Sequence, residues 1–129
     1  MADIDESQDR EADETSYYPD YLLPIIRELE VRYQRFSELR EEVLLSYGYN
    51  TARAYWGDLD DVFMWAAERD KDVLALTEKE IRQYIALLRR RKYSESTIRR
   101  RVTALRKLYR VIGTAPNPAE AIIVKSRKP

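Results

Sequence analysis

The chain has 129 residues, enough for one domain, and contains no cysteine and no histidine. These absences exclude disulfides, thiol nucleophiles, the commonest metal ligand and the usual general base. We therefore expect no catalytic residues, no metal, no cofactor and no small-molecule substrate. Hydrophobic residues make up 44% and charged residues 36%, which is typical of a globular domain with a heavily charged surface.

No apolar run approaches the roughly 20 residues that span a bilayer. The N-terminus is acidic, unlike a signal peptide. We expect a cytoplasmic protein with no membrane partner.

The net charge of +0 conceals a segregation of charges along the chain. Residues 1–20 hold one basic and eight acidic side chains, whereas residues 89–129 hold thirteen basic and two acidic ones, net +11. Such a basic segment is typical of nucleic-acid-binding proteins. Residues 1–16 have almost no apolar content, which predicts a disordered acidic tail. That tail is either solubilising or an arm that competes with DNA for the basic face.

A first helix is predicted from about Leu22 to Leu45, within an N-terminal segment spanning residues 17–45. Pro24 is tolerated in its first turn. Its polar face mixes both signs of charge, so it is a poor candidate for binding phosphates. An apolar stripe at helical spacing is formed by Leu22, Ile25, Leu29, Phe36, Leu39 and Val43.

A second helix is predicted to open at Asn50 or Thr51, both good N-cap residues. Its buried side is marked by Tyr55, Leu59, Val62 and Ala66. The same helix carries Asp58, Asp60 and Asp61. Three carboxylates on an exposed helical face are usually solvated, so we interpret them as surface residues and not as a magnesium site.

Thr77 and Glu80 have the spacing of a capping box, which predicts the start of a third helix. Its inward side is predicted to consist of Ile81, Tyr84, Ile85 and Leu88. The helix ends in the basic run 89–92. Cations there also suit the negative end of the helix dipole, so this run has a structural explanation beside a functional one.

A fourth helix is predicted from Ser94 or Ser96 to just before Gly113. At roughly 100° per residue, an apolar arc of about 80° faces a second arc of about 120° that contains no acidic residue. The second arc consists of Arg99, Arg100, Thr103, Arg106, Lys107 and Arg110. Because unpartnered like charges repel, this arc indicates a polyanionic ligand. Arg101 lies nearer the apolar edge and is interpreted as a snorkelling flank residue.

Asn117 and Pro118 predict an N-cap and first position for a short last helix, Ala119–Val124. Residues 125–129 are basic and linker-like. The expected architecture is all-α, a compact bundle of four to five helices over residues 46–124, with the extra N-terminal helix before it.

Four stretches together resemble the N-terminal core-binding, SAM-like domain of tyrosine recombinases and phage integrases. The stretch Asn50–Tyr55, with Asp58-Leu59 and Phe63, is similar to the first helix of that domain. Leu76-Thr77, followed by Ile81, Tyr84-Ile85 and Leu88, is similar to its second helix. The most recognisable stretch is Ser94–Arg100 with Ala104–Arg106 and Leu108-Tyr109, and Asn117-Pro118 with Ile122 is similar to the closing element. The resemblance covers about residues 46–128.

The resemblance implies a module that forms one half of a clamp around duplex DNA, with helices in the major groove. The family's catalytic domain would follow Pro129, so we expect no enzymatic activity from these residues. The implied DNA-binding residues, with Arg110 added from the cationic arc, are Arg53, Arg82, Arg89, Arg90, Arg99, Arg100, Thr103, Arg106, Lys107 and Arg110.

Besides duplex DNA, the expected partners are a recombinase catalytic domain or further copies of the chain. Two alternatives stay open at this point. The chain could be a stand-alone, helix-turn-helix-like accessory or transcriptional factor. It could also be a protein-interaction bundle whose basic face binds an acidic protein.

Overall fold

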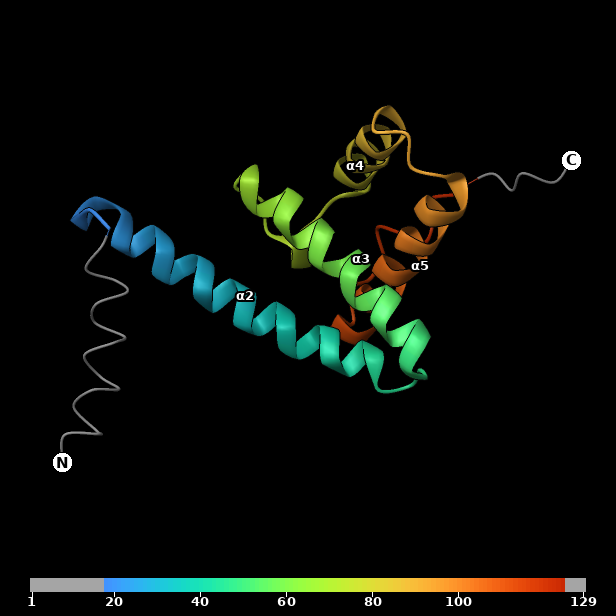
Figure 1. Cartoon of the computed structure of the whole chain (residues 1–129), viewed down its shortest axis with the longest axis horizontal. Coiled ribbons are helices and arrows are strands. Elements are labelled where there is room, and N and C mark those ends of the chain that lie inside the picture. Colours follow the sequence, from blue (N-terminus) through green and yellow to red (C-terminus); the bar gives the residue numbers. More distant parts are fainter. Residues whose placement is uncertain (1–17, 125–129) are drawn as a thin grey trace, which may run out of the picture. The chain divides into compact units, whose positions relative to one another are not determined.

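The computed structural model describes residues 18–124, which form four α-helices, two short 3₁₀ helices and no strand (Figure 1). This confirms the all-α class. Within this range no helix is both long and apolar enough to cross a membrane. The predicted acidic tail, 1–16, and the basic stretch, 125–129, lie outside the described residues. The elements are η1 (Asp20–Leu22), α2 (Leu23–Leu44), α3 (Tyr49–Glu68), η2 (Val73–Ala75), α4 (Glu78–Arg90) and α5 (Glu95–Ile112).

The chain divides into two compact units, residues 1–33 and 34–129, and the division falls within α2. The predicted apolar stripe of α2 is buried only in the second unit. There Phe36 is fully buried and stacks on Phe63 of α3 with ring centroids 4.9 Å apart. In the first unit, Ile25 and Leu29 are 59% and 41% exposed. The apolar stripe is therefore covered in the second half of the helix and exposed at Ile25 and Leu29 in the first.

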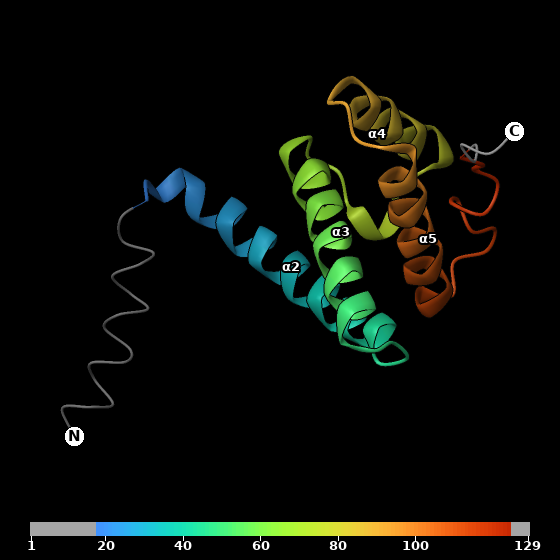
Figure 2. The ribbon, with the colours of Figure 1, turned by 45° about the vertical axis from the view of Figure 1, so that its right-hand side comes forward.

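The core of the second unit lies between α3, α4 and α5 (Figure 2). Helix α5 packs against both α3 and α4, and η2 packs against α3. Burial of each large apolar side chain contributes about 1.5–3 kcal/mol. The fully or nearly fully buried side chains include Leu59, Val62, Ile81, Leu88, Ile98, Leu105 and Leu108. Each of these lies on the inward side of its helix.

The starts of α3 and α4 differ, because side chains cap α4 but not α3. Helix α3 begins at Tyr49 after Gly48, whose carbonyl accepts a hydrogen bond from Ala52 N–H at 2.9 Å. The prediction of Asn50 or Thr51 as the N-cap is therefore wrong by two or three residues. In α4 the capping box is confirmed, because Thr77 Oγ1 accepts from Glu80 N–H and the Glu80 carboxylate accepts from Thr77 N–H.

Helix α5 is capped at both ends as its sequence predicts. Ser94 Oγ accepts a hydrogen bond from Thr97 N–H at 3.1 Å. Gly113 ends the helix at φ +84°, in the left-handed region that favours glycine. Near that end, the buried Tyr109 hydroxyl accepts from Leu76 N–H and donates to Val73 C=O at 2.7 Å, which ties η2 to α5.

The predicted short helix Ala119–Val124 is wrong, because the segment forms turns. Asn117 Oδ1 does accept from Ala119 N–H at 3.0 Å, as an N-cap would. The guanidinium of Arg106, however, donates to the carbonyl oxygens of Ala119 (3.0 Å) and Ile122. The side chain of an α5 residue thus binds carbonyls of this segment, whose described backbone hydrogen bonds join residues three apart, as in β-turns.

Candidate nucleic-acid interface

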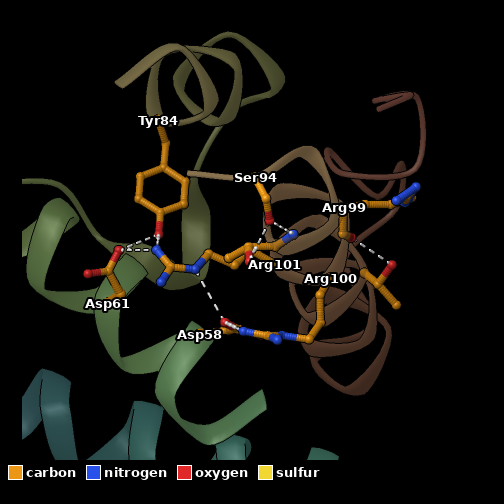
Figure 3. Close-up of polar contacts among 9 residues, drawn as sticks. Asp58, Asp61, Tyr84, Ser94, Arg99, Arg100 and Arg101 are labelled. Carbon is orange, nitrogen blue, oxygen red and sulfur yellow. Dashed lines mark hydrogen bonds and ion pairs between the residues drawn. The ribbon is translucent and has the colours of Figure 1, made fainter. Parts of the chain in front are cut away.

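A buried carboxylate on α3 joins that helix to the first turns of α5 (Figure 3). The side chain of Asp58 is only 2% exposed. It accepts two hydrogen bonds from Arg100, from Nε at 2.6 Å and from Nη2 at 2.9 Å. It also accepts one from Arg101 Nε at 3.2 Å. One aspartate therefore neutralises part of the charge of two consecutive arginines.

Arg101 is the centre of this network and not a snorkelling flank residue. Its side chain is 11% exposed. Its Nη1 donates to Asp61 at 2.7 Å and to the Tyr84 hydroxyl at 3.0 Å, and that hydroxyl donates to Asp61 at 2.5 Å. Burial, together with the hydrogen bond to Asp61, raises the pKa of Tyr84. The interpretation from the apolar edge failed because the buried partners of Arg101 come from α3 and α4.

The three aspartates of α3 are therefore not a solvated acidic face, as the sequence had suggested. Asp58 and Asp61 bind arginines of α5, and Asp60 Oδ1 accepts from Arg40 Nη1 at 3.0 Å. Arg40 is itself buried and lies over the Trp56 ring, 4.1 Å from its centroid. Across residues 18–124, no group of acidic side chains is arranged to hold a metal ion.

Most of the arginines predicted to face DNA have partners within the domain. Arg100 binds Asp58, and Arg106 binds two backbone carbonyls. Three more form ion pairs with nearby glutamates: Arg82 with Glu78 at 3.1 Å, Arg89 with Glu95 at 3.0 Å, and Arg110 with Glu120 at 2.5 Å. The cationic arc of α5 is thus not without acidic partners. The arc itself has no acidic residue, but the fold brings carboxylates to it from elsewhere in the chain.

The remaining predicted cations are free of such pairs. Arg53 on α3 and Arg90 on α4 are exposed, and Arg99 on α5 is partly exposed. Over the described part of the chain, none of the three forms an ion pair within 4 Å. The pKa of Glu95 is lowered by its hydrogen bond to Arg89 and, to a smaller extent, by the charge of Arg99.

The last two predicted residues take part in contacts of other kinds. Lys107 Nζ lies 5.0 Å from the centroid of the Tyr47 ring. Thr103 Oγ1 donates to the carbonyl of Arg99 at 3.0 Å, within α5. Neither contact is an ion pair.

An open groove of about 580 Å³ lies between α3 and the start of α5. Arg53 and Arg100 both line it, from different helices. The network carboxylates Asp58, Asp60 and Asp61 line it as well, each engaged by an arginine. The groove thus combines an unpaired guanidinium with one that is held by a carboxylate.

Comparison with known proteins identifies the fold. The model of the family described as "Phage integrase, N-terminal SAM-like domain" matches residues 34–112. The chain belongs to this family. No curated protein and no solved structure matches the chain. The match begins at Gln34, the residue at which the second compact unit begins.

In this integrase domain the sequence alone did not identify two exposed cations as candidates for the interface, or two residues as partners in the buried network. Arg91 and Lys92, which follow α4, are exposed and form no ion pair within the described range, although the basic run 89–92 was a visible signal. Asp58 and Arg101 were missed as partners because they lie 43 positions apart. Nothing in one sequence indicates which aspartate meets which arginine.

Proposed function

We propose that this chain is a duplex-DNA-binding module of a tyrosine recombinase, and that the residues present carry no strand-cleavage chemistry of their own. The supporting observation is that three helices of the integrase domain each carry an at least partly exposed arginine that forms no ion pair among the described residues. These are Arg53, Arg90 and Arg99. Arg91 and Lys92 add two further cations between α4 and α5.

Duplex DNA suits these residues better than single-stranded nucleic acid. Arginines neutralise phosphates and can bind guanine through two hydrogen bonds, and an α-helix fits the major groove. Single-strand binding uses exposed aromatic rings as stacking platforms. In this domain Tyr84 and Tyr109 are buried, and both hydroxyls are hydrogen-bonded internally. Tyr49, Trp56 and Tyr93 are exposed, but guanidinium groups already lie over two of these rings, Arg40 over Trp56 and Arg101 over Tyr93.

The proposal predicts weak duplex binding with a steep dependence on salt. If about six phosphates are neutralised, the affinity falls on the order of a thousandfold between about 50 and 200 mM salt. Fluorescence anisotropy with a labelled duplex measures this directly. An affinity that does not depend on salt contradicts the proposal. So does the absence of duplex binding at about 50 mM salt if an acidic protein binds the chain under the same conditions.

The proposal also predicts no covalent protein–DNA adduct. The chain has no histidine to act as a general base, and Tyr84 and Tyr109 of the domain are buried, which raises their pKa. The measurement is incubation with a suicide DNA substrate followed by denaturing electrophoresis. A denaturation-resistant band containing both protein and DNA would overturn this part.

A further inference from the structure

Arg100 and Arg101 share the carboxylate of Asp58 but differ strongly in exposure. The side chain of Arg100 is 44% exposed, that of Arg101 is 11% exposed, and that of Asp58 is 2% exposed. Arg101 is also held by Asp61 and Tyr84, whereas Asp58 is the only ion-pair partner of Arg100 within the described residues. Arg100 is therefore the member of this network that can leave it most easily.

Departure of Arg100 would not strand the buried carboxylate. An ionised aspartate left unpaired in the interior is strongly destabilising. Asp58 Oδ1 lies 3.2 Å from Arg101 Nε, so one charged hydrogen bond remains after Arg100 has moved. The network thus holds Arg100 in the free protein without depending on it.

The surroundings of Arg100 suit a phosphate group. Its side chain lines the open groove that Arg53 also lines, and Arg53 has no ion pair among the described residues. Asp60 and Asp61 line the same groove, but Arg40 and Arg101 respectively pair with them. A phosphate at the rim would offer Arg100 a two-oxygen acceptor equivalent to the carboxylate that it leaves.

We propose that Arg100 is an exchangeable DNA ligand: it binds Asp58 in the free protein and transfers to a backbone phosphate when duplex DNA docks, while Arg101 remains on Asp58. This rests on the proposed function. Asp58 then acts as a competitor that weakens DNA binding through Arg100 alone. If Arg100 instead stayed on Asp58 in the complex, it would make no contribution to DNA binding.

The first test follows the arginine side chains of the unmodified protein by NMR. The Nε–Hε resonances of Arg100 and Arg101 are assigned with the variants Arg100→Gln and Arg101→Lys. On titration with a duplex, the Arg100 resonance should shift and return at high salt, while the Arg101 resonance shifts less, because Arg101 keeps its bonds to Asp58 and Asp61. An unchanged Arg100 resonance, while backbone amides of α5 shift, overturns the exchange and leaves the proposed function standing. No shift anywhere overturns the proposed function and the exchange with it.

The second test is a double-mutant cycle on DNA affinity. Asp58→Asn removes the competing carboxylate and should raise the affinity about two- to fivefold, because the Arg100 side of the pair is half-exposed. In an Arg100→Gln background it should have no effect. A general charge effect would instead raise affinity equally in both backgrounds, and that result overturns the proposal.

The salt dependence of binding gives a third test, with Arg69→Gln as the matched control for Arg100→Gln. Arg100→Gln should reduce the slope of log affinity against log salt by about 0.9, the value for one lost phosphate contact. Arg69→Gln removes the same charge at the end of α3, where Arg69 pairs with Glu68, and should leave the slope unchanged. Equal slopes for the two variants contradict the exchange. Circular dichroism checks that each variant is folded. If Asp58→Asn is unfolded, the NMR test on the unmodified protein decides the proposal instead of the cycle.

Discussion

Three consecutive arginines of α5 have three different environments. Successive helical residues are rotated by about 100°, so neighbours in sequence face different surroundings. Arg101 is directed into the network with Asp61 and Tyr84, Arg100 binds Asp58 at the rim, and Arg99 is directed away from both (Figure 3). The charge of a residue is therefore a weak guide to its role until its partners are known.

We expect the buried Tyr84 to make the folded protein lose stability at alkaline pH. Burial raises its pKa above the ordinary value of 10.0, so the folded protein holds this proton more tightly than the unfolded chain does. Its contribution to the free energy of unfolding is full below about pH 10 and is lost as pH rises beyond that value. Urea unfolding at about pH 8 and pH 11 should show a smaller alkaline loss for Tyr84→Phe than for the unmodified protein.

The control for this prediction is Tyr49→Phe, at a side chain that is 76% exposed. Its alkaline loss should match that of the unmodified protein. At about pH 8, Tyr84→Phe alone should already cost about 1.5–3 kcal/mol through the lost hydrogen bond to the Asp61 carboxylate. Identical pH profiles for the two variants would contradict the assignment.

At the scale of elements, α5 combines several tasks on one helix. Its apolar side builds the core with Ile98 and Leu105, and its first turns bind the aspartates of α3. Its last turns hold the C-terminal segment through Arg106 and Arg110. Arg106 was predicted to contact DNA, and the structure shows that both of its described bonds go to backbone carbonyls of that segment.

We therefore expect Arg106 to contribute to stability and Arg99 to contribute to DNA binding, and experiments can separate the two roles. Arg106→Ala should lower the free energy of unfolding by about 1–3 kcal/mol, because the carbonyls of Ala119 and Ile122 both lose the guanidinium as a donor, although that of Ala119 keeps its turn bond from Ile122 N–H. It should also make residues 114–124 more sensitive to protease. Arg99→Ala should change stability by less than about 0.5 kcal/mol while reducing the salt slope of DNA binding by about 1. Equal loss of stability in the two variants would contradict this division of roles.

On the scale of the whole molecule, the charge is divided between the two ends of the chain. Residues 1–16 carry one basic and seven acidic side chains, net −6, against the net +11 of residues 89–129. Opposite charges in one chain attract, and the acidic end also repels phosphates. Both effects disfavour DNA binding and are screened by salt.

Removal of residues 1–16 should leave the melting temperature unchanged and the DNA affinity equal or higher. The buried side chains of the second unit all come from residues 36–124, so the core keeps its contacts. Any gain in affinity should be largest at low salt, because the attraction is electrostatic. Calorimetry and anisotropy on the shortened chain provide the measurements, and weaker DNA binding after truncation would count against the prediction.

The sequence by itself determined the features that depend on neighbours along the chain. The approximate positions of the four α-helices, the capping box of Thr77 and Glu80, the cap residues Ser94 and Gly113, and the inward face of α4 follow from spacings of a few residues. Hydrogen bonds at helix ends and apolar periodicity act within one or two turns, so they can be read locally. The family resemblance rests on the same local patterns.

Only the tertiary structure decided which charges remain available to a ligand. Asp58 meets Arg100 and Arg101 across more than forty positions, and Arg106 binds carbonyls 13 and 16 positions away. An ion pair depends on the distance between two side chains in space, and spacing along the sequence encodes that distance only for near neighbours on one helix, such as Glu78 and Arg82. The arc of cations on α5 is real, but the fold neutralises much of it and leaves Arg99 unpaired among the described residues.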